Sequence, residues 1–337
     1  MKAQQKSRLI EVFRFERQFI AILCFLALSS CNTTDEVIDC GTVLDYASEI
    51  GTATLLVLEN GKPIIEFGDL DYPYMCHSIR KPFLSALYGI FVERGLIDID
   101  MTLEELQVDD LPPSLTAIEK SATVKDLLLA RSGIYHEAAG ESLSMIESRP
   151  TRGSHLPGTF FYYNNWDFNA LGTIFEHQVG DNIFDSFYNE IAQPIGMNHF
   201  NPDDCTYVYE TSKSEHPSYF FRMSTRDMAR FGLLYIHKGS WDRRQIIPEE
   251  WIEESTAIYP IRNNLYDPYG YLWMIVPEES SLENGYYHTG YRGHLLGVLP
   301  ERKLVIVHRV DTDFPFDSVS LDQVRILVEM VLEKIDD

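Results

Sequence analysis

The sequence predicts an α+β protein in which the two ends of the chain build one antiparallel sheet, flanked by helices, with a helical middle region. Strand-like runs occur near both ends, at residues 52–69 and 286–311. Amphipathic segments with helix start and stop signals fill much of the stretch between them. Because 45% of the residues are hydrophobic, we expect one large domain, residues 46–337.

The first strand pair is predicted in TATLLVLENGKPIIEFGD, residues 52–69. Two β-prone runs flank Asn60-Gly61, the strongest two-residue signal for a hairpin turn. A helix should follow and begin close to Ser78, because Pro82 is tolerated only in a first turn. Gly95 marks its end.

Helices are predicted through the middle of the chain. Thr102 and Glu105 have the spacing of a capping box, and Ser224 and Gly239 have the positions of a helix cap and a helix stop. Pro248 suits the first turn of a further helix. The predicted segments are MTLEEL (101–106), VKDLLLARSG (124–133), NALGTIFEHQVG (169–180), STRDMARFGLLYIHKG (224–239) and IPEEWIEEST (247–256).

The C-terminal part predicts two strands and a closing helix. The strand-like runs are YYHTGYRGHLLGVL (286–299) and KLVIVHRVD (303–311), and a turn at 300–302 separates them. SLDQVRILVEMVLEKI (320–335) is amphipathic at helical spacing. Strands from both ends can then pair, and we expect a cleft where the helical region meets the sheet, beside the Ser78 helix.

The formal net charge of −23 excludes a nucleic-acid partner, because an acidic surface repels phosphates and no basic patch offsets it. The N-terminus carries Lys and Arg residues before FIAILCFLAL (19–28), which has the length of a signal-peptide core. Leu28-Ser-Ser-Cys31 resembles the processing site of bacterial lipoproteins. We therefore predict a signal peptide at 1–30, a membrane-anchoring lipid on Cys31 and a location outside the cytoplasm, in the cell envelope. The alternatives are an uncleaved anchor or an ordinary signal peptide.

Residues 31–45 are predicted to form a polar tether. Three cysteines then remain in the mature chain, Cys40, Cys76 and Cys205. One disulfide, Cys40–Cys205, and three buried thiols are both compatible with the sequence. Their spacing fits no metal site.

Ser78 and Lys81 form a Ser-x-x-Lys pattern, and a helix would place both side chains on one face. Two further segments follow in order, residues 157–180 with a Tyr-x-Asn pattern and residues 288–307 with a His-x-Gly pattern. Together they resemble the serine β-lactamase and penicillin-binding protein family, in particular its class C β-lactamase, D,D-peptidase and esterase branch. The likeness covers residues 50–335 and implies the fold of that family.

The register of the second motif is set by the resemblance, because Pro-Gly-Thr at 157–159 precedes the tyrosine at a fixed distance. This distance assigns Tyr163 and Asn165 to the motif, and Tyr162 is then expected to have a packing role. His288, Thr289 and Gly290 match the third motif, and the resemblance implies that they bind substrate together with Asn165. Asn164 stands where a serine is common in this branch.

The resemblance implies a serine hydrolase without metal or organic cofactor. Ser78 would attack an ester or amide, Lys81 and Tyr163 would transfer protons, and Asn165 would orient a substrate amide and hold Lys81 in place. The backbone N–H groups of Ser78 and Tyr291 would form the oxyanion hole. A serine hydroxyl needs such a base, and lysine serves only when burial and nearby positive charge keep its amine neutral.

The sequence does not identify the substrate beyond a small molecule or a peptide. Peptidase, amidase or esterase activity is favoured over β-lactam hydrolysis. His288 replaces the lysine that many β-lactamases have in the third motif, and it is a hypothetical partner for a substrate carboxylate. Arg292 is the competing partner. The alternative function is a non-catalytic or single-turnover sensor that binds penicillins or cell-wall peptides.

Overall fold

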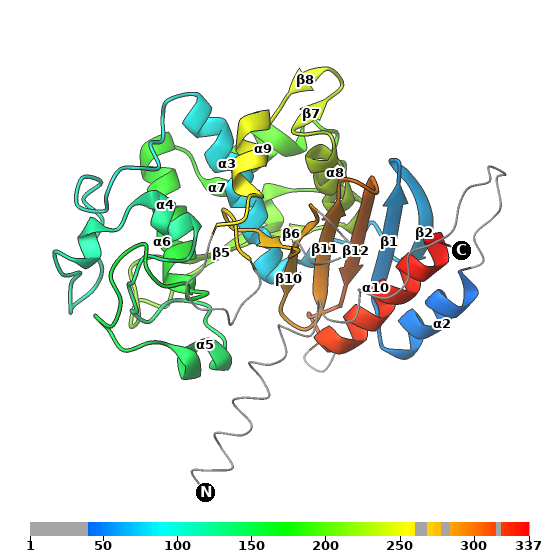
Figure 1. Cartoon of the computed structure of the whole chain (residues 1–337), viewed down its shortest axis with the longest axis horizontal. Helices are drawn as coiled ribbons and strands as arrows, with labels where there is room; N and C mark the ends of the chain where they lie inside the picture. The colour runs from blue at the N-terminus through cyan, green and yellow to red at the C-terminus, as the bar shows by residue number, and fades with distance from the viewer. Residues whose placement is uncertain (1–39, 260–267, 278–283, 315–317, 337) are drawn as a thin grey trace, which may run out of the picture.

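The computed structural model describes residues 40–259, 268–277, 284–314 and 318–336 (Figure 1). The predicted signal peptide and the lipidation candidate Cys31 lie outside these residues. Within the described ranges, no helix is long and apolar enough to cross a membrane.

The two ends of the chain build one antiparallel sheet of six strands, which confirms the predicted fold class (Figure 1). Its order is β2-β1-β12-β11-β10-β9, so a C-terminal strand pairs directly with the first strand. In that pair Leu56 lies opposite Val307. The strands are β1 (Thr54–Glu59), β2 (Lys62–Gly68), β9 (Met274–Ile275), β10 (Tyr286–Gly290), β11 (His294–Leu299) and β12 (Leu304–Arg309).

A separate hydrophobic core covers each face of the sheet. Along β1, Leu55 and Val57 belong to one core and Leu56 and Leu58 to the other, as the two-residue period of a strand requires. Helices α2 (Gly41–Glu49) and α10 (Leu321–Asp336) cover the first face, and α8 (Thr225–Ile236) packs on the second (Figure 1).

The helical region lies beside the β9 end of the sheet, and α3 passes between the two parts (Figure 1). Its main helices are α3 (Arg80–Glu93), α4 (Val124–Leu128), α5 (Leu143–Ser148), α6 (Asn165–Val179), α7 (Ile183–Phe187) and α9 (Glu249–Ser255). Three two-stranded pairs complete it: β3 (Tyr74–Met75) with β6 (Arg222–Met223), β4 (Thr206–Val208) with β5 (Ser218–Phe220), and β7 (Ser240–Trp241) with β8 (Arg244–Gln245).

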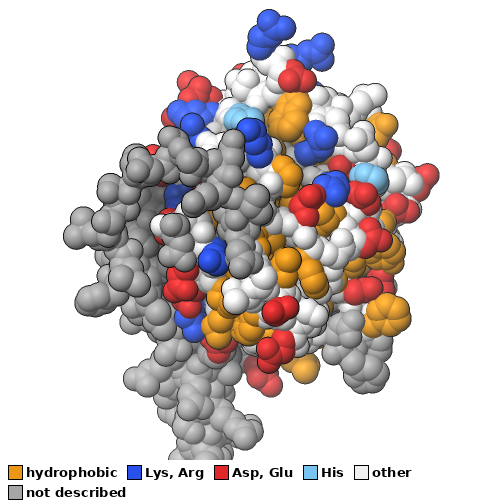
Figure 2. Space-filling model, turned by 90° about the vertical axis from the view of Figure 1, so that its right-hand side faces the viewer, with side chains coloured by type: hydrophobic (Ala, Val, Ile, Leu, Met, Phe, Trp, Pro, Cys, Tyr) orange, Lys and Arg blue, Asp and Glu red, His pale blue; other side chains and the backbone are white. Residues whose placement is uncertain are grey.

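The open edge of the sheet at β2 carries charged side chains. Figure 2 shows acidic and basic side chains intermixed on this end of the molecule. On β2, Glu66 accepts a hydrogen bond from Arg226 at 2.6 Å, and the same guanidinium contacts Asp71 at 3.0 Å. Charges at an edge strand disfavour pairing with a second sheet.

Two predicted elements are wrong. Thr102 and Glu105 exchange the hydrogen bonds of a capping box, but only a turn follows them. The run 286–299 is not one strand but two, β10 and β11, joined by a turn at Tyr291–Gly293. The positive φ values of Arg292 (65°) and Gly293 (101°) reverse the chain there.

One statement about the N-terminal part also needs correction, and one open alternative is decided. Helix α2 begins at Gly41, so the last residues of the predicted tether belong to the folded domain and pack against α10. Of the two alternatives that the sequence left open for the cysteines, a Cys40–Cys205 disulfide does not form. Cys76 and Cys205 are free thiols, the first buried and the second half-buried.

Candidate active site

Ser78 lies in a short 3₁₀ turn, His77–Ile79, that leads directly into α3. The Nζ atom of Lys81 is 2.9 Å from Ser78 Oγ, so the two side chains of the first motif meet at hydrogen-bond distance. Lys81 is 0% exposed. Helical spacing brings the pair together, as the sequence predicted, and the start of the helix adds positive potential.

The surroundings of Lys81 favour a neutral amine. Burial, followed by the positive charge of Arg80, lowers the pKa of Lys81 well below its usual value. Its Nζ atom lies 4.7 Å from the ring centre of Tyr163 and 4.6 Å from that of Phe168. A neutral amine at hydrogen-bond distance from a serine can accept its proton.

The structure places Tyr163, not Tyr162, beside Lys81. The Tyr162 hydroxyl donates to the carbonyl oxygen of Met145 at 2.6 Å, so it holds α5 in place and is not available to the lysine. The Tyr163 ring also faces His288, with ring centres 6.3 Å apart. This geometry agrees with the register taken from Pro-Gly-Thr.

The two asparagines of the second motif have different surroundings. Asn164 is the N-cap of α6, since its side chain accepts from the Trp166 N–H, and it donates to the carbonyl of Ile134 at 2.6 Å. Asn165 donates to the carbonyl of Gly140 at 2.7 Å. Its Oδ1 atom is buried, and no described protein group binds it, so a substrate N–H can use it. A hydrogen bond between Asn165 and Lys81, by which Asn165 was expected to hold the lysine in place, is not among the described hydrogen bonds.

The third motif lies at the end of β10. His288 is fully buried, and its Nδ1 atom is 2.7 Å from the carbonyl oxygen of Thr289. A carbonyl only accepts, so Nδ1 carries the proton and the neutral ring presents an acceptor at Nε2. Burial, followed by the charge of Lys81, lowers the pKa of His288 well below 6.5. The hypothesis that a charged His288 binds a carboxylate at neutral pH is therefore not supported.

Gly290 and Thr289, the other two residues of the third motif, contact other parts of the protein. A Cβ atom at Gly290 would lie 2.8 Å from the Cβ of His294 and 3.2 Å from the carbonyl oxygen of Cys76. Glycine is thus required because this strand approaches the segment before Ser78, and not only to admit a substrate. Thr289 points away from His288, and its hydroxyl contacts the sulfur of Met274 at 3.9 Å.

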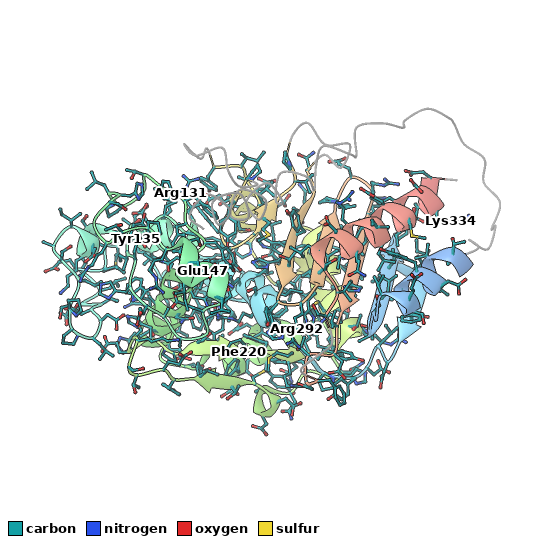
Figure 3. The ribbon with its side chains drawn as sticks, turned by 90° about the horizontal axis from the view of Figure 1, so that it is seen from below. Arg131, Tyr135, Glu147, Phe220, Arg292 and Lys334 are labelled. Carbon is teal, nitrogen blue, oxygen red and sulfur yellow. The ribbon has the colours of Figure 1, made fainter. Side chains whose placement is uncertain are left out.

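The remaining predicted site residue, Tyr291, begins the turn after β10, and its side chain is 57% exposed. Its ring packs edge-on against His77, the residue before Ser78, with centres 5.5 Å apart. Seen from below, Glu147 and Phe220 lie on the side of the helical region, and Arg292 lies nearer to the sheet (Figure 3). They come from α5, β5 and the β10–β11 turn.

Sequence reasoning missed Arg80 and Arg309, two fully buried cations near Ser78. Arg309 donates to the carbonyls of Tyr74 at 2.9 Å and Met75 at 3.0 Å, and so ties β12 to the strand that leads to the nucleophile. For Arg309, a charged residue inside an apolar strand was the available signal. In the described ranges, no cluster of three or more His, Cys, Asp or Glu side chains suits a metal ion.

A serine beside a buried lysine at the start of a helix, at the border between an antiparallel sheet and a helical region, is the arrangement of a serine hydrolase. The chain belongs to the β-lactamase family, because the model of that family matches residues 43–328.

Comparison with solved structures shows the same fold. A proposed 6-aminohexanoate-dimer hydrolase from Bacillus anthracis has a TM-score of 0.67 at 21% identity, over 86% of this chain and 80% of that one. An octameric penicillin-binding protein homologue from Pyrococcus abyssi gives 0.62 at 18% identity, over 88% and 78%. A class C β-lactamase solved with cefoxitin gives 0.64 at 14% identity, over 88% and 99%.

Proposed function

We propose that this protein is a serine hydrolase that forms an acyl-enzyme at Ser78 from an ester or amide substrate. The observation that carries the proposal is the 2.9 Å distance between Ser78 Oγ and the fully buried Lys81 Nζ. Lys81 takes the hydroxyl proton as Ser78 attacks the carbonyl carbon. Tyr163 carries the proton onward to the leaving group, and water then releases the acyl group.

Binding groups complete the proposed reaction. The N–H groups of Ser78 and Tyr291 stabilise the oxyanion, and loss of one such donor typically costs about 10²–10³ in rate. Asn165 Oδ1 accepts a substrate N–H, and the neutral His288 accepts a hydrogen bond at Nε2. Both acceptors suit a substrate with an amide N–H, and the histidine in place of the third-motif lysine favours peptidase, amidase or esterase activity over β-lactam hydrolysis.

The proposed location is the outside of the cell, with the chain held at a membrane by a lipid on Cys31. The basic and apolar N-terminal segment supports this proposal. Labelling cells with a radioactive fatty acid tests it: label should be found in the wild-type protein and be absent from Cys31→Ala.

The catalytic proposal is tested with a phosphonate probe that reacts only with activated serines. The wild-type protein should gain one adduct by mass spectrometry, and Ser78→Ala should gain none while keeping its melting temperature. An adduct of unchanged yield on Ser78→Ala would show that another residue is the nucleophile.

A second assay separates a hydrolase from a sensor. A nitrophenyl ester and a fluorescent penicillin are offered to the same preparation. Repeated turnover of the ester supports the hydrolase. Stoichiometric, stable labelling by penicillin without ester turnover supports the single-turnover sensor, in which the acyl group stays on Ser78.

A further inference from the structure

Arg80 lies inside the Ser-x-x-Lys motif, and the proposed reaction does not use it. Its side chain is only 2% exposed. A guanidinium keeps its positive charge at all ordinary pH values. Burying such a charge without a carboxylate partner costs free energy, so a function of the charge itself would explain its position.

Neutral groups hold the Arg80 side chain in place. Its Nη2 atom donates to Ser218 Oγ at 2.9 Å and lies 3.5 Å from Asn169 Oδ1. Its Cζ atom lies 4.1 Å from the ring centre of Tyr219. The Nη1 atom has no hydrogen-bond partner in the described part of the chain, and no ion pair between described residues includes Arg80. The charge is fixed in position and not neutralised.

The other titratable groups around Lys81 do not compensate this charge. From β10, His288 is neutral, as argued above. From β5, burial raises the pKa of Tyr219 to about 12, so its hydroxyl stays protonated. Tyr269 packs against Tyr163, and burial raises the pKa of Tyr269 well above its usual value.

The nearest acid on α6 is Asp167, and it is engaged elsewhere. Its Oδ1 atom accepts from Ser132 Oγ at 2.5 Å and from Asn164 Nδ2 at 3.0 Å. Burial raises the pKa of Asp167 well above its usual value, which favours the uncharged acid. The Lys81 amine therefore packs on Phe168 of α6, next to the Asn169 that contacts the Arg80 guanidinium, and no described carboxylate pairs with it.

We propose that Arg80 is a positioning residue whose buried positive charge keeps the Lys81 amine neutral. Many β-lactamases have a second cation in the third motif, and here a neutral His288 takes that place. The charge is supplied from within the Ser78 helix instead. This inference rests on the proposed function, because it requires Lys81 to act as the base for Ser78.

The test measures the rate of acylation by an uncharged phosphonate ester from pH 5.5 to 9.5, because a neutral probe reports on Lys81 and not on substrate charge. Arg80→Met should move the midpoint of the rate profile up by about one pH unit, so at pH values well below the wild-type midpoint the rate falls roughly tenfold. The difference should shrink as the pH rises. Arg80→Lys should not restore the wild-type midpoint, because burial without a carboxylate partner favours a neutral amine at position 80 as it does at Lys81.

Ser218→Ala is the matched control for a merely structural role. It removes the 2.9 Å hydrogen bond to Arg80 but leaves the charge in place, so the melting temperature should fall while the midpoint stays. A rate that falls equally at every pH in Arg80→Met, or a midpoint that moves as far in Ser218→Ala, would overturn the inference.

A measurement on the wild-type chain keeps the inference testable if Arg80→Met does not fold. The ¹³Cε signal of Lys81, assigned with Lys81→Arg, should show a neutral amine at pH 7.5, and a charged amine would refute the inference. Absence of any probe adduct on the wild-type protein would instead refute the proposed function, so the two failures can be told apart.

Discussion

At the scale of single residues, two adjacent tyrosines illustrate how surroundings decide a role. Tyr163 faces Lys81, whereas the Tyr162 hydroxyl is bound to a backbone carbonyl. We expect Tyr163→Phe to slow acylation by about 10²–10⁴-fold with little change in melting temperature. Tyr162→Phe should instead cost about 1 kcal/mol of stability and keep most of the rate. Both are read from probe kinetics and thermal unfolding; a larger rate loss for Tyr162→Phe would contradict the assignment.

The buried His288 predicts how anionic ligands bind. Since burial keeps its ring neutral, the affinity of Ser78→Ala for a peptide with a free carboxylate should not change between pH 6.5 and 8.5. Calorimetry on this variant measures binding without chemistry. An affinity that weakens steadily as the pH rises through that range would mean that His288 binds the carboxylate as a cation after all.

The contact between Ser78 and Lys81 could be predicted from the sequence, because residues three apart in a helix lie on the same face. Arg80 could not, since its position among Ser218, Asn169 and Tyr219 depends on strands and helices far along the chain. Strand alternation turns Thr289 away from His288, and its expected role in substrate binding stays a prediction.

At the scale of elements, α8 packs so closely on the sheet that its glycine has no room for a side chain. A Cβ atom on Gly232 would lie 2.6 Å from Val305 Cγ1 on β12. Gly232→Ala should therefore destabilise the protein by about 1–3 kcal/mol in denaturant unfolding. Val305→Ala removes the obstructing methyl groups, so the double variant should lose less stability than the sum of the two single variants. If the stability losses of the two single variants simply add, the contact with Val305 does not limit the space at Gly232.

Elements with both a clear period and end signals were predicted well. The hairpin at Asn60-Gly61 and the helix that Ser224 caps are examples. Thr102 and Glu105 show the limit of local signals: their reciprocal hydrogen bonds form, but no helix follows. The run 286–299 is apolar on both faces, because each face packs on a core, so periodicity did not reveal the turn inside it.

At the scale of the whole molecule, the sheet depends on long-range contacts that bring both chain ends together. His308 on β12 is one such contact. Its Nδ1 atom lies 2.7 Å from the carbonyl oxygen of Gly293, and its Nε2 atom lies 2.9 Å from Thr52 Oγ1. The carbonyl fixes the proton on Nδ1, so the neutral ring joins the segment before β1, strand β12 and the β10–β11 turn.

These contacts predict how stability depends on pH. Burial lowers the pKa of His308 to about 4, and burial followed by the charge of Arg309 lowers that of His77 to about 4. Their pKa is about 6.5 in the unfolded chain. Between these values the unfolded chain binds more protons, so the free energy of unfolding rises with pH. The contribution is complete above about pH 6.5 and is lost as the pH falls toward 4.

Thermal unfolding from pH 7.5 to 4 measures this dependence. Each histidine contributes at most about 3 kcal/mol, so the melting temperature should fall steeply below pH 6.5. His308→Gln should lower the melting temperature at pH 7.5, because it breaks the link between the chain ends, but should flatten the decline in acid. If the variant declined as steeply as the wild type between pH 6.5 and 4, His308 would not be the group that takes up the proton.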